Sequence, residues 1–171
     1  QLKVGDKLRL SGPYGRFFIK KSTNTPMLFI AGGSGLSSPK SMILDLLKEG
    51  CELPITLMYG ARSQTELYYD QEFKDLAAKH PNFTYIAALS DEPADSGWTG
   101  PRGFVHEAAK AHFNNDFSGR KAYLCGPPPM IEAAITTLMQ GRLYERDIYA
   151  EKFISAVDST NTVRSPLFKN I

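Results

Sequence analysis

Short apolar runs alternate with amphipathic stretches along most of the chain, from residue 27 to residue 153. The apolar runs predict strands at 27–31, 55–59, 83–89, 122–125 and 148–153. Between them, apolar side chains recur at helical spacing, which predicts helices around residues 42–47, 69–77, 105–112 and 130–139, the last of them capped by Gly141. Strands that alternate with helices favour an α/β fold, a doubly wound five-stranded parallel sheet with right-handed crossovers.

The first residues follow a different pattern. Leu8 and Leu10 alternate with charged residues, Gly12-Pro13 interrupts them, and an apolar stretch resumes at Phe17. This pattern is typical of a β-hairpin, but the segment is too short to bury a core alone. We therefore expect three parts: residues 1–22 as the end of a larger unit, 23–153 as the α/β domain, and 154–171 as a polar tail.

Composition narrows the function. The 171 residues carry 20 Lys+Arg against 18 Asp+Glu, a net charge of +2 that gives no reason to expect nucleic acid as a partner. No apolar run reaches the ~18 residues of a membrane span, so no membrane partner is expected. The two cysteines and three histidines lack metal-site spacing, and no metal site is predicted. We expect a cytoplasmic setting and, because the first residue is Gln1, a missing upstream part.

A glycine-rich turn follows the strand at 27–31, in the sequence Ile30-Ala-Gly-Gly-Ser-Gly-Leu-Ser-Ser-Pro39. Glycines let the backbone turn tightly and approach a phosphate, and the start of the following helix favours an anion. Pro39 suits the first helical turn. The turn lacks the third glycine of the G-x-G-x-x-G fingerprint, and an ordinary glycine-rich strand-to-helix turn remains an alternative interpretation.

A second strand end with a glycine lies in Tyr123-Leu-Cys-Gly-Pro-Pro-Pro-Met130. Ligands of open parallel sheets bind beyond the carboxyl ends of the strands, near the switch in strand order. Two such strand ends suit a two-part ligand such as a dinucleotide. Cys125 can alternatively be a small buried hydrophobic residue, and that is the only interpretation for Cys51.

Five motifs in order, GGSGLSSP, YGARS, LSDEP, CGPPPM and EKF, resemble the ferredoxin–NADP⁺ reductase superfamily. The GPYGRFF segment resembles the end of that family's antiparallel flavin-binding β-barrel, and the resemblance covers residues 2–153. The sequence is most similar to the reductase components of multicomponent phenol hydroxylases. Those proteins join a [2Fe–2S] ferredoxin domain, an FAD barrel and an NADH domain, and pass electrons from NADH to an oxygenase component.

The resemblance implies a cofactor site for NADH. Arg62 would reach the adenosine half or its phosphates, although a plain surface arginine is an alternative, and Cys125 would lie near the nicotinamide C4. The full set that the resemblance assigns to cofactor binding is Gly32, Gly33, Ser34, Gly35, Leu36, Arg62, Ser90, Asp91, Cys125, Gly126, Pro127, Pro128 and Met130.

Ser90 and Asp91 lie where NADPH-dependent relatives hold the 2′-phosphate. A carboxylate accepts hydrogen bonds from ribose hydroxyls and repels a phosphate; two like charges ~4 Å apart cost roughly 4 kcal/mol at an effective dielectric near 20. We therefore expect preference for NADH, while an aspartate serving a turn before Pro93 is the alternative.

The resemblance also implies three candidate catalytic residues: Cys125, which would position the nicotinamide, Phe153, which would cover the flavin ring, and Glu151, which would tune a nearby charge. An ordinary strand aromatic and a solvated acid are the alternatives for the last two. The family's flavin-phosphate motifs lie upstream of the matched segment, so the FAD site is expected mostly outside this chain. The [2Fe–2S] centre is expected only in a missing domain. A different electron-transfer member of the superfamily, or a non-catalytic nucleotide-binding module, remains open.

Overall fold

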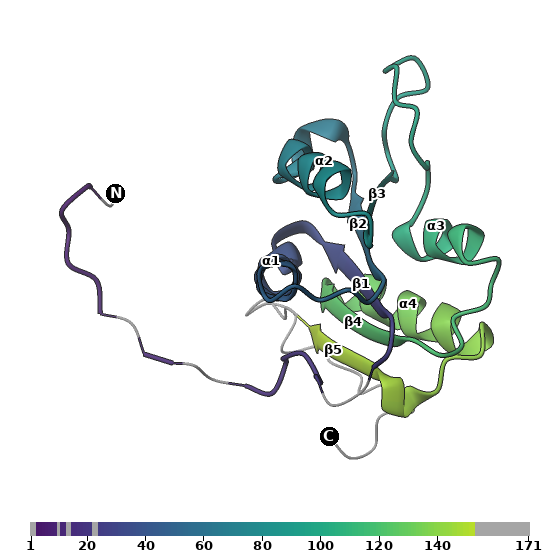
Figure 1. Cartoon of the computed structure of the whole chain (residues 1–171). Coiled ribbons are helices and arrows are strands. Elements are labelled where there is room, and N and C mark those ends of the chain that lie inside the picture. The colour runs from purple at the N-terminus through teal and green to yellow at the C-terminus, as the bar shows by residue number, and fades with distance from the viewer. Residues whose placement is uncertain (1–2, 10, 13–14, 22–23, 153–171) are drawn as a thin grey trace, which may run out of the picture.

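The described part of the structure, a computed structural model, covers residues 3–9, 11–12, 15–21 and 24–152. Its centre is a five-stranded, all-parallel sheet in the order β3-β2-β1-β4-β5 (Figure 1). The strands are β1 (Met27–Gly32), β2 (Ile55–Ala61), β3 (Phe83–Leu89), β4 (Lys121–Gly126) and β5 (Ile148–Lys152). The predicted doubly wound sheet is confirmed, and the strand order reverses between β1 and β4.

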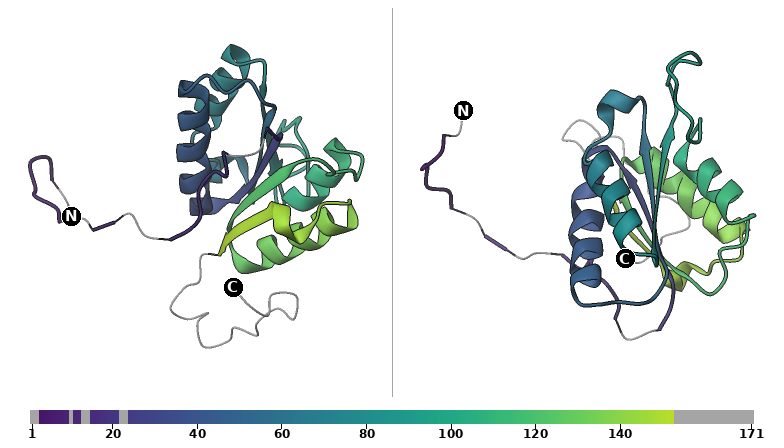
Figure 2. Two further views of the ribbon diagram at one scale, coloured as in Figure 1. Left: turned by 60° about the horizontal axis from the view of Figure 1, so that its bottom comes forward. Right: turned by 45° about the horizontal axis from the view of Figure 1, so that its top comes forward.

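Two helices cover each face of the sheet (Figure 2). On one face lie α1 (Ser37–Lys48) and α2 (Asp70–Lys79), and on the other lie α3 (Val105–His112) and α4 (Pro128–Gln140). Three short 3₁₀ turns, which the sequence did not predict, are η1 (Gly33–Leu36), η2 (Gln64–Glu66) and η3 (Glu145–Asp147). Gly141 caps α4 as expected.

Both faces of the sheet are buried, because parallel strands between two helical layers carry apolar side chains on both sides. The cluster under α3 and α4 includes Ile30, Leu124 and Ile135. The cluster under α1 and α2 includes Phe29 and Tyr123, whose rings stack with centroids 5.2 Å apart. This continuous burial explains why the strands were readable as short apolar runs.

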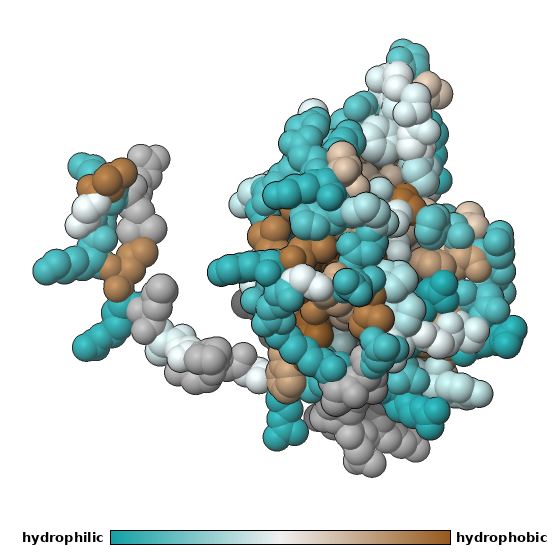
Figure 3. Space-filling view, in the orientation of Figure 1, coloured by the Kyte–Doolittle hydropathy of each residue, from teal (hydrophilic) through white to brown (hydrophobic). Residues whose placement is uncertain are grey.

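The first described residues form no strand within 3–9, 11–12 and 15–21. Val4 and Leu8 are exposed, and this part of the chain extends away from the rest of the molecule (Figure 3). The predicted half-buried strand around Leu8 is therefore not found in the described residues, because a lone hairpin lacks neighbours against which to bury a face. Closer to the sheet, Phe17 and Ile19 pack against the α1 and α2 cluster. The backbone N–H of Lys20 donates to the Tyr123 hydroxyl at 3.0 Å.

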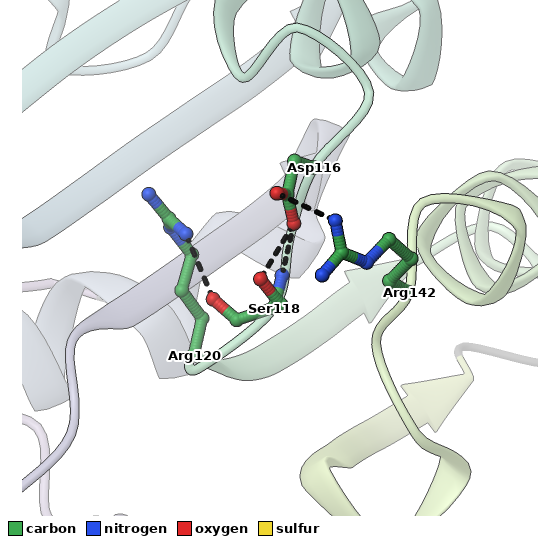
Figure 4. A network of polar contacts seen from close by, with 4 residues as sticks. All are labelled: Asp116, Ser118, Arg120 and Arg142. Atoms are coloured by element: carbon green, nitrogen blue, oxygen red, sulfur yellow. Dashed lines mark hydrogen bonds and ion pairs between the residues drawn. The ribbon is translucent and has the colours of Figure 1, made fainter.

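A polar network fixes the entry into β4 (Figure 4). The Asp116 carboxylate accepts hydrogen bonds from the backbone and hydroxyl of Ser118 at 3.0 and 2.6 Å, and it pairs with Arg142 at 3.2 Å. Arg120 donates to the Ser118 carbonyl at 3.1 Å. The bonds from Ser118, more than the arginines, hold the pKa of Asp116 below its usual value. The network joins the turn before β4 to the loop after α4.

Phe153 and the predicted tail at 154–171 lie outside the described residues. The predicted domain boundaries after residues 22 and 153 stay predictions.

Candidate functional site

A cleft of about 760 Å³ opens at the carboxyl ends of the central strands. Its walls come from the ends of β1, β2 and β3, from the loops that follow them, and from α3 and α4. The lining residues are Gly32, Gly33, Gly60, Ala61, Arg62, Glu66, Tyr68, Ala88, Ser90, Gly103, Phe104, Val105, His106, Pro127, Pro129, Met130 and Ala133. This is the edge at which open parallel sheets bind ligands, next to the reversal of strand order.

Six of the predicted cofactor-binding residues line the cleft: Gly32, Gly33, Arg62, Ser90, Pro127 and Met130. Seven others stand outside its lining: Ser34, Gly35, Leu36, Asp91, Cys125, Gly126 and Pro128. The motifs therefore lie at the edge of the sheet where the cleft opens, while only part of each motif faces the hollow.

The glycines at the end of β1 and directly after it have different structural roles. Gly33 has φ +54, and a Cβ there would meet nothing within 4 Å, so its backbone borders open space. At Gly32, a Cβ would lie 2.5 Å from the Met130 sulfur. At Gly35, a Cβ would collide with the Cys125 carbonyl group and the Gly126 Cα. Gly35 therefore lets η1 pack on the end of β4 and has a packing role rather than a place in the cleft wall.

Arg62 and Glu66 form the charged part of the cleft wall. The Arg62 Nε lies 3.9 Å from the Glu66 Oε2, and the Arg62 backbone N–H donates to the same oxygen at 3.3 Å. Tyr68, about half exposed, follows on the same loop. Glu66 and Tyr68 were not predicted as site residues, although both stand within six residues of Arg62, and this closeness in sequence was the available signal.

The opposite wall is aromatic. Phe104 is 61% exposed, and its ring stacks on His106 with centroids 5.7 Å apart and planes 12° apart. Neither His106 nor Phe104 was predicted from the sequence as a site residue. An apolar residue directly before a predicted helix was the available signal. Aromatic faces of this kind can pack on a planar ring of a ligand.

Cys125 lies beside the cleft, on the α1 side of the sheet. It is fully buried; its Sγ lies 3.9 Å from the Glu151 Oε2, which the Ser38 hydroxyl also reaches at 3.4 Å. Burial, and then the Glu151 charge, raises the pKa of the thiol to about 12. The thiol is therefore protonated at neutral pH and is not a nucleophile. Ser38 was not predicted as a site residue.

The loop between β3 and α3 borders the cleft at Ser90, Gly103 and Phe104. It projects from the molecule (Figure 1). Glu92 joins it to η2, accepting hydrogen bonds from the Gln64 backbone at 2.8 Å and from the Gln64 side chain at 2.5 Å. Asp91 is exposed, and its backbone N–H donates to the Arg62 carbonyl at 2.9 Å.

Within the described residues, no three His, Cys, Asp or Glu side chains gather in a way that could hold a metal ion. Over the same part of the chain, every helix is too short or too polar to cross a membrane.

Comparison with known proteins assigns the class. A family model for the oxidoreductase NAD-binding domain matches residues 29–136, and the chain belongs to this family. The expected resemblance to ferredoxin–NADP⁺ reductase-like NAD-binding domains is thereby confirmed.

Two curated relatives match over the whole of this chain. The chain is 61% identical to the phenol 2-monooxygenase reductase component DmpP of Pseudomonas sp. (strain CF600), and 55% identical to the phenol hydroxylase P5 protein of Acinetobacter pittii (strain PHEA-2). In each case it covers 49% of the relative. The chain thus spans about half the length of the curated relatives it matches.

Among solved structures, the Amycolatopsis cytochrome P450 reductase GcoB is similar, with a TM-score of 0.76 and 31% identity, over 85% of this chain and 43% of that one. The ferredoxin reductase in carbazole 1,9a-dioxygenase matches with a TM-score of 0.71 and 27% identity, over 83% and 41% of the two chains.

Proposed function

We propose that the chain is the NADH-binding part of a phenol hydroxylase-type reductase, which delivers hydride from NADH to FAD. Electrons would then pass to a [2Fe–2S] centre and an oxygenase component, in the cytoplasm. The observation that carries the proposal is the cleft at the carboxyl ends of the strands, built from residues of the GGSG, YGAR and CGPPPM motifs. High identity to two reductase components of this type supports it.

In this proposal, NADH lies along the cleft with its pyrophosphate against Gly32 and Gly33. Gly33 offers backbone without a Cβ in open space, which allows close approach of a phosphate. The adenosine half extends toward Arg62 and Ser90, and the nicotinamide extends toward the end of β4. The aromatic wall at Phe104 and the apolar surface of Met130 exclude water from the ligand.

Cys125 and Glu151 lie where the nicotinamide would leave the cleft, and we assign them a positioning role. A buried thiol with a raised pKa stays neutral and presents a compact, polarisable surface to the ring. Ser38 holds the Glu151 carboxylate through its hydroxyl. Phe153 follows Glu151 by two residues and is proposed to cover the flavin.

FAD would accept the hydride when bound, and its binding groups are proposed to lie mostly outside this chain. The described residues contribute the strand-end edge formed by Cys125 and Glu151, and the segment of residues 1–22 is proposed as the last hairpin of the flavin barrel. What the chain itself does is hold the dinucleotide and orient its reactive ring toward that edge.

The proposal is tested by nucleotide titration of variants on α4. Ala133→Trp places a large side chain in the cleft from a helical position that tolerates it, and we expect NADH affinity to fall about tenfold or more because the volume is occupied. Met139→Trp, further along α4 and exposed, is the matched control and should bind as the wild type does. NADH fluorescence reports both. The proposal is wrong if the wild-type chain binds no NADH, or if Ala133→Trp binds it unchanged.

A further inference from the structure

We propose that Glu66 selects NADH over NADPH by holding Arg62 away from a 2′-phosphate. The inference rests on the proposed function, since it names the cofactor form that the same cleft accepts. It assigns the selection to a residue on the loop after β2, in addition to the expected contribution of Asp91 after β3.

Few charged side chains line the cleft. Among the described residues that line it, Arg62 is the only lysine or arginine and Glu66 is the only carboxylate. A bound NADH already brings a negatively charged pyrophosphate, and NADPH adds a further phosphate. The only lysine or arginine with which the described cleft residues could bind the additional 2′-phosphate of NADPH is therefore Arg62, which Glu66 already engages.

The geometry fixes the Glu66 carboxylate in this place. Its Oε2 accepts a hydrogen bond from the Arg62 backbone N–H, so the carboxylate is anchored to the backbone just after β2 and does not depend on the Arg62 side chain. The Arg62 Nε then approaches the same oxygen at 3.9 Å. The neighbouring end of β3 is tied to this point, because the backbone N–H groups of Ser90 and Asp91 donate to Ala61 and Arg62.

The chemistry separates the two cofactors. A carboxylate accepts hydrogen bonds from the two hydroxyls of an unphosphorylated ribose, which donate. A 2′-phosphate replaces one of these donors, and its negative charge repels the carboxylate. Arg62 would also have to leave Glu66 in order to bind the phosphate. Both side chains are partly exposed, at 75% and 49%, so solvent screens the pair and the discrimination it supplies is moderate.

The experiment measures the dissociation constants of NAD⁺ and NADP⁺ by calorimetry for the wild type and for Glu66→Gln. Glutamine keeps an oxygen that can accept the Arg62 N–H, but it removes the charge. We expect NADP⁺ affinity to rise roughly two- to fivefold relative to NAD⁺, and this gain to shrink as salt is raised. A role for Glu66 in loop structure alone would change both affinities together and would not depend on salt in this way.

Three further variants complete the design. Glu52→Gln removes an equal charge from an exposed site before β2, at the opposite end of the sheet, and should leave the ratio unchanged. Adding Arg62→Met to Glu66→Gln should abolish the gain, since the freed cation is what binds the phosphate. Asp91→Ser tests the contribution of Asp91 separately. If Asp91 also favours NADH, the difference in affinity between NADH and NADPH should narrow in this variant.

The outcomes are distinguishable. If the wild type binds neither nucleotide, the proposed function is wrong and the inference is overturned with it. If the wild type binds NAD⁺ but Glu66→Gln leaves the ratio of the two constants as it was, the proposed function stands and Glu66 is not a selector.

Discussion

Gly35 shows how a single absent Cβ positions the site. The residue stands outside the cleft lining, yet η1 can rest on the end of β4 only because no side chain separates Gly35 from the Cys125 carbonyl group. The atoms that a Cβ at Gly35 would meet belong to the backbone, and they cannot move aside as a flexible side chain would. Close packing of this kind makes small additions costly.

We therefore predict that Gly35→Ala destabilises the fold by about 2–3 kcal/mol and weakens NAD⁺ binding, because η1 must shift away from β4. Gly119→Ala is the control: Gly119 has φ +69 but open space around its Cβ position, so it should lose about 1 kcal/mol through backbone strain and keep its affinity. Urea unfolding and calorimetry report the two quantities. Equal losses in both variants would show that the contact with β4 does not matter.

The loop between β3 and α3 is held together by the hydrogen bonds of one side chain, Arg102. The Arg102 guanidinium donates to the carbonyls of Glu92, Pro93 and Trp98 at 2.6, 3.0 and 3.3 Å. These bonds close the loop on itself where it has little apolar burial. Because the ends of the loop border the cleft, its order bears on the nucleotide as well.

Arg102→Met should therefore speed amide hydrogen exchange throughout residues 90–104 and lower NAD⁺ affinity a few-fold. Global stability should change by less than about 1 kcal/mol, because the arginine is exposed. Arg146→Met, which removes an exposed arginine paired with Asp147, is the matched control and should leave exchange in that loop unchanged. Exchange rates that do not respond to Arg102→Met would contradict this account.

At the scale of the whole molecule, four buried or half-buried acidic groups have pKa values shifted in the same direction, upward. Burial raises the pKa of Cys125 from 9.0 to about 12, and it raises the pKa values of Tyr59, Tyr85 and Tyr123 above 10.0. The folded protein therefore favours the neutral, protonated form of each of these groups. Above about pH 9 the unfolded chain releases protons that the folded chain keeps. The stability that these groups contribute is present below pH 9 and is lost as pH rises through the folded pKa values.

We predict a melting temperature that is steady from pH 7 to about pH 8.5 and falls above pH 9, with each group adding at most ~1.4 kcal/mol per pH unit. Tyr85→Phe removes one such group, and the fall should be less steep, although the variant also loses the bond from the Tyr85 hydroxyl to Asp70. Tyr144→Phe alters an exposed tyrosine and should leave the slope alone. Calorimetric scans across this pH range provide the test.

The sequence by itself determined the order and type of the main elements. The strands of a doubly wound sheet are buried on both faces, so β3 could be placed to the residue as Phe83–Leu89 and β1 to within one residue. A helix end could also be predicted from its capping residue, as with Gly141 at the end of α4. The ordered motifs were enough to indicate the family that the NAD-binding domain model then confirmed. The N-terminal hairpin was not found in the described residues, because a strand depends on neighbours that local pattern does not supply.

Only the tertiary structure decided which side chains share the cleft. Tyr68, Phe104 and Ala133 come from three separate stretches of the chain, and no local pattern relates them. Within one motif, some residues line the cleft and others pack against the sheet, depending on how the backbone turns after the strand. Gly33 faces the cleft, while Gly35 contacts β4. Sequence spacing indicates the edge of the sheet at which the cleft opens; packing in three dimensions fixes which side chains line it.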